Sequence, residues 1–103
     1  MNHKEKFDRC VGVVSRRTGV PEKKILSGAR AKPVVDARHL LYYSCHRMGM
    51  GISYIIPYIT MATEGKMSPV YNSIGYAIEK VHVLAKNSDD LNDMINEIVN
   101  ECS

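Results

Sequence analysis

The chain has 103 residues, of which 45% are hydrophobic, and its 14 Lys or Arg against 11 Asp or Glu give a formal net charge of +3. This length and hydrophobic content suffice for one ordinary core, so we expect a single domain over residues 1–103. The longest apolar runs are far shorter than the roughly 20 residues that cross a bilayer, which excludes a membrane-spanning helix.

The charge is unevenly distributed along the chain. Residues 1–32 contain nine Lys or Arg against three acids, whereas residues 67–103 contain two Lys against six acids. This asymmetry favours a basic surface for a polyanion and an acidic face turned elsewhere. The alternative is a solvated charged surface that has no partner.

The cysteines predict neither a disulfide framework nor a metal site. Cys10, Cys45 and Cys102 are odd in number and widely spaced, and the charged start of the chain does not resemble a secretory signal. Cys45 is followed by His46, with His39 nearby, but no metal-ligand spacing completes a site. We therefore expect no metal, no cofactor and a reduced cytoplasmic setting, associated with the nucleoid.

Hydrophobic spacing predicts three helices in the first half of the chain. Residues 4–18 form an amphipathic pattern that ends at Gly19, a typical C-cap. Residues 20–26 predict a short second helix, which Gly28 ends, and a third helix begins at Pro33 and ends at about Met48. The side chains expected in the core are Phe7, Cys10, Val11, Val14, Ile25, Leu26, Val34, Ala37, Leu40, Leu41, Ser44 and Cys45.

A fourth and a fifth helix are predicted beyond the glycines at 49 and 51. Ser53 is a plausible N-cap for a short fourth helix, in which Pro57 is awkward unless the helix begins there. Ser68 and Pro69 predict the start of the fifth helix, as an N-cap serine followed by a proline in the first turn. We expect that helix to run to about Lys86.

A last, acidic helix is expected at about residues 88–102. Ser88 can cap it, and Asp89 and Asp90 favour the positive end of the helix dipole. The core residues predicted for the last three helices are Ile55, Ile56, Ile59, Ile74, Ala77, Ile78, Val81, Leu84, Ala85, Leu91, Met94, Ile95, Ile98 and Val99.

These patterns predict an all-α domain of five or six helices. The tight turn expected between the third and fourth helices suggests a helix-turn-helix, in which a later helix enters the major groove of DNA. Gly65-Lys66 resembles the end of a phosphate-binding loop, but the upstream glycine and the adjacent hydroxyl residue are missing. We therefore predict that the protein is not an enzyme.

Several segments resemble a known family in order and spacing. Residues 20–30 contain Ile-Leu-Ser followed by an arginine, and residues 34–39 read Val-Val-Asp-Ala-Arg-His. Residues 51–57 and 70–81 are the next two segments that match the family in order. From about Phe7 to Leu84 the chain is similar to the C-terminal DNA-binding domain of the bacterial replication initiator DnaA, which belongs to the Trp-repressor-like group. The family's Asp-His pair is Val70-Tyr71 here, and its ATPase domain is missing. A regulator, a phage or mobile-element protein and a competitor for initiator sites all fit this resemblance.

The resemblance implies binding to double-stranded DNA in replication or transcription control. It assigns Arg30, supported by Lys32, to the narrow minor groove of A·T-rich DNA. It assigns polar groups of the fifth helix to base edges in the major groove, where Asn72 can pair bidentately with adenine. These base-reading residues are Tyr71, Asn72, Ser73 and Tyr76, and the phosphate contacts, which position without specifying, are Arg38, His46, Arg47, Ser53 and Lys66.

Each of these residues also has a simpler structural interpretation. Arg30 and Lys32 could belong to a solvated loop, Arg38 could pair with an acid such as Asp36 or Glu22, and tyrosines are more often core or interface rings. The alternative function is a protein-interaction module that keeps the fold and binds a replication or transcription protein through the Tyr-rich fourth and fifth helices. RNA binding is a third hypothesis, and the oligomeric state is open.

Overall fold

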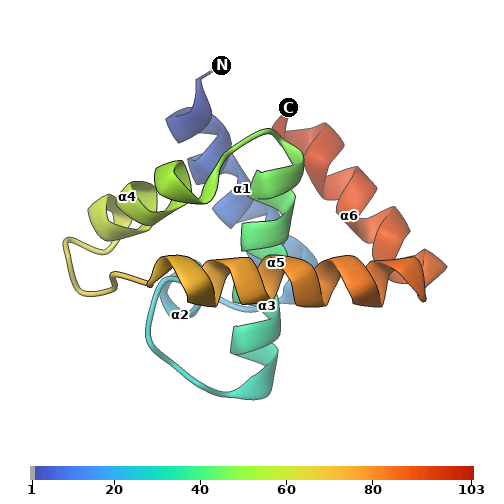
Figure 1. Ribbon diagram of the computed structural model, residues 1–103, viewed down its shortest axis with the longest axis horizontal. Coiled ribbons are helices and arrows are strands. Elements are labelled where there is room, and N and C mark those ends of the chain that lie inside the picture. The colour runs from blue at the N-terminus through green and yellow to red at the C-terminus, as the bar shows by residue number, and fades with distance from the viewer. Residues whose placement is uncertain (1) are drawn as a thin grey trace.

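The computed structural model describes residues 2–103, which form six α-helices joined by loops (Figure 1). The described residues contain no strand, so the predicted all-α class is confirmed. No helix among them is long and apolar enough to cross a membrane. The helices are α1 (His3–Thr18), α2 (Glu22–Ile25), α3 (Lys32–Arg47), α4 (Ile52–Ala62), α5 (Tyr71–Lys86) and α6 (Asp89–Cys102).

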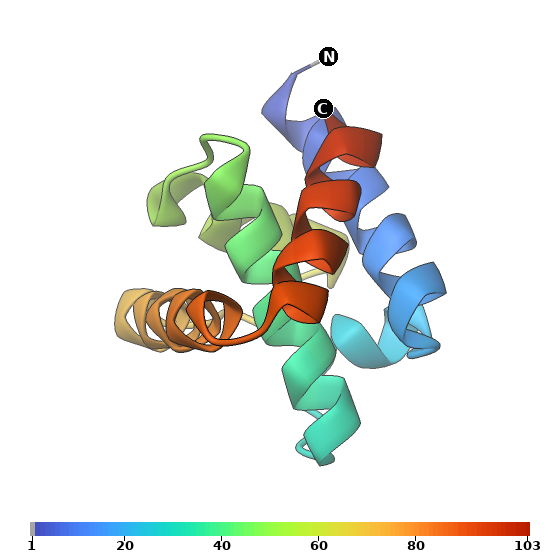
Figure 2. The ribbon, with the colours of Figure 1, turned by 90° about the vertical axis from the view of Figure 1, so that its right-hand side faces the viewer.

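Helix α3 is the centre of the fold. It contacts each of the other five helices, and Figure 2 shows it between α1 and α5. Its residues from Leu40 to Cys45 are all buried, so this part of the helix is enclosed on every side. A helical segment whose side chains are buried on every side must have neighbours on every side. Each of the other helices buries only one of its faces.

The last helix packs back onto the first. Three ion pairs join them, with Arg16 to Glu101 at 2.7 Å and Arg17 to both Glu97 and Glu101. Beneath these pairs three fully buried free cysteines lie in the shared core, Cys10 on α1, Cys45 on α3 and Cys102 on α6. The hydrogen bond with Cys10, together with burial, raises the pKa of the Cys102 thiol. These thiols therefore behave as small core side chains.

Two predicted helix caps are confirmed. Gly19 closes α1 in the left-handed region at φ 76°, where its N–H donates to the Ser15 carbonyl, and glycine meets this backbone at no steric cost. The Ser88 side chain accepts a hydrogen bond from the N–H of Leu91 at 3.2 Å and so caps α6.

The two other predicted caps are wrong. Helix α4 begins at Ile52 with Gly51 as its N-cap, so Ser53 lies in the first turn and Pro57 lies inside the helix. Helix α5 begins at Tyr71 with Val70 as its N-cap, so Ser68 and Pro69 belong to the preceding loop.

A side-chain hydrogen bond between the end of α4 and the following loop precedes the late start of α5. The hydroxyl group of Thr63, at the end of α4, accepts a hydrogen bond from the N–H of Met67 at 3.1 Å and donates one to the Ile59 carbonyl at 2.8 Å. Thr63 is buried, and Met67 is partly buried against the core. This contact holds the loop against α4 before a helix can begin at Ser68.

One predicted core residue is also misplaced. The Leu84 side chain is 50% exposed, although its spacing puts it on the apolar face of α5. It borders a hollow between α3, α5 and α6 that the packing leaves open. Conversely, Met50 is fully buried although it lies in the loop between α3 and α4.

Replacing Pro57 with alanine should stabilise the protein. Pro57 is exposed and stands inside the 11-residue helix α4, where it cannot donate the hydrogen bond that a helical N–H makes to the carbonyl four residues earlier. We expect P57A to raise the free energy of unfolding by about 1–3 kcal/mol in urea titrations. P33A is the matched control, because Pro33 lies in the first turn of α3, where no such hydrogen bond is missing. An equal gain in P33A would contradict this explanation.

Candidate nucleic-acid interface

The connection from α2 to α3, residues 26–31, carries Arg30 as an exposed side chain. A serine organises the start of the connection: the Ser27 hydroxyl group donates to the Lys24 carbonyl at 2.7 Å and accepts from the N–H of Ala29 at 3.2 Å. Among the described residues Arg30 forms no ion pair, whereas Lys32 pairs with Asp36 at 3.0 Å. Arg30 is thus free for a ligand, and Lys32 is partly neutralised.

Arg38 holds this connection in place. From the first half of α3 its Nε donates to the Ile25 carbonyl at 2.9 Å, and one Nη donates to the carbonyls of Ala29 at 3.0 Å and Lys24 at 3.4 Å. These carbonyls include two at the C-terminal end of α2, where no intrahelical partner is available. Burial lowers the pKa of Arg38, yet the group stays charged because an arginine pKa starts so high. The Arg38 side chain is therefore bonded to backbone carbonyls, and not to Asp36 or Glu22, which were considered as partners from the sequence.

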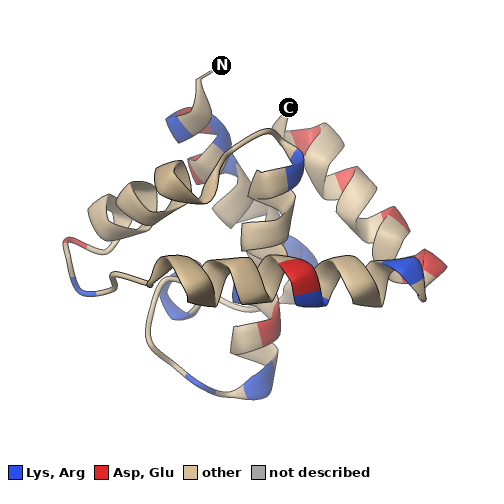
Figure 3. Ribbon diagram, viewed as in Figure 1, with Lys and Arg blue, Asp and Glu red and all other residues tan. Residues whose placement is uncertain are grey.

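A shallow hollow brings α2 beside the loop between α4 and α5. Lys23 and Ser27 line one side of it, and Lys66 lines the other. Glu22 and Glu64 also line the hollow, so its own charges balance. Figure 3 shows the two connecting segments carrying Lys and Arg on one side of the molecule, whereas all charged residues of α6 are acidic.

Two further cations lie close in the sequence to residues that line the hollow. Lys24 follows Lys23 in the sequence, and Arg30 lies three residues after Ser27. Among the described residues Lys23, Lys24 and Lys66 form no ion pairs. With Arg30 they make four unpaired cations against two acids in this region, which we call the basic region.

The start of α5 follows the basic region along the chain, five residues after Lys66. Tyr71, Asn72 and Ser73 are exposed there, and Tyr76 is 67% exposed one turn later. No side chain caps this helix, and its first turn contains no acid. Its free N–H groups and the positive end of its dipole are therefore available to an anion.

The remaining predicted contacts lie elsewhere. His46 and Arg47 are exposed at the C-terminal end of α3, about 22 Å from Lys32 at the rise of a regular helix. There Arg47 donates to the side-chain oxygen of Asn96 on α6 at 2.9 Å. Ser53 is exposed in the first turn of α4. The fold thus brings Lys66 and the Arg30 segment to one region and leaves His46 and Arg47 at the far end of α3.

Sequence reasoning did not single out Lys23 and Lys24. Both are exposed on α2, directly before the basic connection, and Lys23 lines the hollow with Lys66. The sequence feature that could have identified them is a pair of adjacent lysines six and seven residues before Arg30. Lys23 and Lys66 are far apart in the sequence, so the sequence could not predict that they line the same hollow.

The R38K substitution should destabilise the fold while keeping the charge. Lysine cannot reproduce the planar fork that reaches three carbonyls, so at least one carbonyl at the end of α2 would lose its partner. We expect the free energy of unfolding in urea to fall by about 1–3 kcal/mol. R9K is the control, because Arg9 is exposed and forms no side-chain hydrogen bond in the described chain. Wild-type stability in R38K would show that these bonds do not hold the connection.

Comparisons of the chain with models of protein families, with curated proteins and with solved structures found no significant match.

Proposed function

We propose that the protein binds double-stranded DNA through the basic region and the start of α5. The observation that carries this proposal is the group of four unpaired cations, Lys23, Lys24, Arg30 and Lys66, beside a helix start that has no capping side chain. Cations in such a group attract the phosphate backbone, and this attraction supplies most of the affinity of DNA-binding proteins.

Within this proposal the residues of the basic region make different contacts with DNA. Arg30 enters the minor groove from a connection that Arg38 and Ser27 hold in shape. Lys23, Lys24 and Lys66 contact phosphates, which fixes the orientation of the protein on the duplex. Arg38 acts as a positioning residue because its donors are already engaged by carbonyls.

Helix α5 is the proposed reader of base edges. The tight turn of residues 48–51 joins α3 to α4, and α5 would be the later helix that enters the major groove. The exposed Tyr71, Asn72 and Ser73 are the base-reading candidates, because the N-terminal residues of a recognition helix commonly contact base edges. A DNA-binding domain of this kind suits the control of replication or transcription.

Titration of an A·T-rich duplex at several salt concentrations tests the proposal. Log affinity should fall linearly with log salt, because each contacted phosphate releases counterions. R30A should weaken binding by about 1–3 kcal/mol, the range for a good groove contact. R9A removes the same charge from exposed α1 outside the basic region and should change affinity far less. Absent or salt-independent binding would overturn the proposal, and equal losses in R30A and R9A would remove Arg30 from the interface.

A second candidate function is protein binding through α5. Seven large apolar side chains are exposed in the part of the chain that the structure describes, and five of them lie between Val70 and Leu84. Tyr76 at 67% exposure and Val83 at 48% line one shallow hollow on the outer side of α5. Such a concentration on one helix is typical of an interaction surface.

Pull-down from a nuclease-treated extract tests this second candidate. Immobilised wild-type protein should retain a replication or transcription protein after nucleic acid is removed. The double variant Y76S/V83S should lose that partner, because both side chains line the same hollow. Y54S tests whether α4 belongs to the same surface, since Tyr54 is also exposed, at 54%. A partner that is lost on nuclease treatment would instead indicate bridging by nucleic acid.

A further inference from the structure

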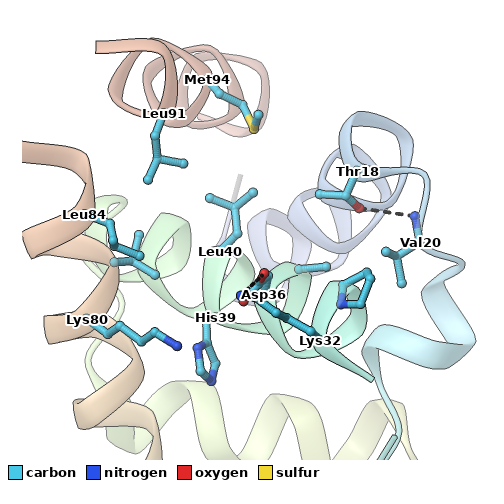
Figure 4. Close-up of a pocket in the computed structure, with 13 residues that line it drawn as sticks. Thr18, Val20, Lys32, Asp36, His39, Leu40, Lys80, Leu84, Leu91 and Met94 are labelled. Atoms are coloured by element: carbon cyan, nitrogen blue, oxygen red, sulfur yellow. Dashed lines mark hydrogen bonds and ion pairs between the residues drawn. The ribbon is translucent and has the colours of Figure 1, made fainter. Parts of the chain in front are cut away.

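The hollow beside Leu84 is a partly enclosed and mainly apolar recess of the surface. It has a volume of about 380 Å³ and is formed by α3, α5, α6 and the connection from α1 to α2 (Figure 4). This volume lies at the lower end of the range for small-molecule sites, roughly 300–1,000 Å³. A peptide helix would need a longer groove, so the size favours a small ligand.

The hollow has an apolar side and a polar side. Leu91 and Met94 of α6 point into it from one direction, with Leu40 of α3 and Leu84 of α5 next to them (Figure 4). Lys80 of α5 and His39 of α3 lie on the opposite side (Figure 4). A ligand that fills the hollow therefore meets hydrocarbon at one end and charge at the other.

The polar side is electrostatically positive. Its one carboxylate, that of Asp36, is bonded to Lys32 at 3.0 Å, whereas the half-buried Lys80 forms no ion pair in the described chain. Burial and the charge of Lys80 lower the pKa of His39, with Arg38 and Lys32 acting in the same direction and Asp36 against them. A single negative charge beside Lys80 would therefore be stabilised.

We propose that this hollow binds a small amphipathic monocarboxylate. The apolar body would cover Leu40, Leu84, Leu91 and Met94, removing the exposed part of Leu84 from water. The carboxylate would accept a charge-assisted hydrogen bond from Nζ of Lys80, which makes this lysine the residue that selects an anion. The inference goes beyond DNA binding and does not rest on it.

Three probes of equal chain length test the proposal on the full chain without DNA. Octanoate, octanol and octylamine are titrated into ¹⁵N-labelled protein, and amide shifts around residues 36–40, 80–84 and 91–94 are followed. Octanoate should bind saturably and about tenfold more tightly than octanol, the factor expected for one charge-assisted bond, and octylamine should bind most weakly. Equal affinity for octanoate and octanol, or no saturable shift with octanoate, would overturn the proposal.

A pair of lysine variants assigns the selectivity. K80Q should lose the preference for octanoate over octanol while octanol affinity stays the same, because only the charged contact is removed. K86Q is the matched control: Lys86 ends the same helix, is exposed and does not line the hollow. A tenfold preference that persists in K80Q would overturn the role of Lys80. The preference of the wild-type protein tests the carboxylate proposal independently if K80Q does not fold.

Discussion

Burial of the middle of α3 is the constraint on which the structure depends. Six consecutive residues from Leu40 to Cys45 are removed from water, so the chain must supply cover on all sides of one helix. The other five helices provide it by each turning one apolar face inward. Helices packed around a central helix leave gaps between them, and the hollow beside Leu84 is lined by residues of α3, α5 and α6 (Figure 4). The candidate ligand site is thus a by-product of the same packing.

Ion pairing determines which Lys and Arg side chains remain without an acidic partner and can contact a ligand. The acidic α6 does not face solvent alone, because Glu97 and Glu101 neutralise Arg16 and Arg17 at the end of α1. These surface pairs contribute modestly to stability, since exposed ions remain well solvated. Of the ten Lys and Arg that form no ion pair among the described residues, four lie on α2 and the two loops of the basic region, and the other six are spread over α1, α3 and α5.

Helix α5 connects the proposed functions. Its uncapped start adjoins the basic region, its middle carries Lys80 at the edge of the hollow, and its outer side exposes Tyr76 and Val83. The uncapped start lies apart from the other two surfaces along the axis of this 16-residue helix, whereas the hollow beside Leu84 and the outer hollow share Lys80 and Leu84. Arg38 gives the neighbouring connection a fixed shape, so Arg30 is presented by an ordered backbone and not by a free loop.

The sequence by itself determined the all-α class, most of the core and the caps at Gly19 and Ser88, because helical periodicity and local capping act within a few residues. It misplaced the starts of α4 and α5, because a serine was expected to cap each helix, whereas Gly51 and Val70 occupy the N-cap positions. It identified Arg30 and Lys66 as basic candidates, but only the tertiary structure could bring α2 beside the second loop and engage Arg38 with carbonyls. The hollow beside Leu84 was invisible in the sequence because its walls come from four separate segments. Periodicity records which face of a helix is apolar, and only packing decides whether a neighbour covers it.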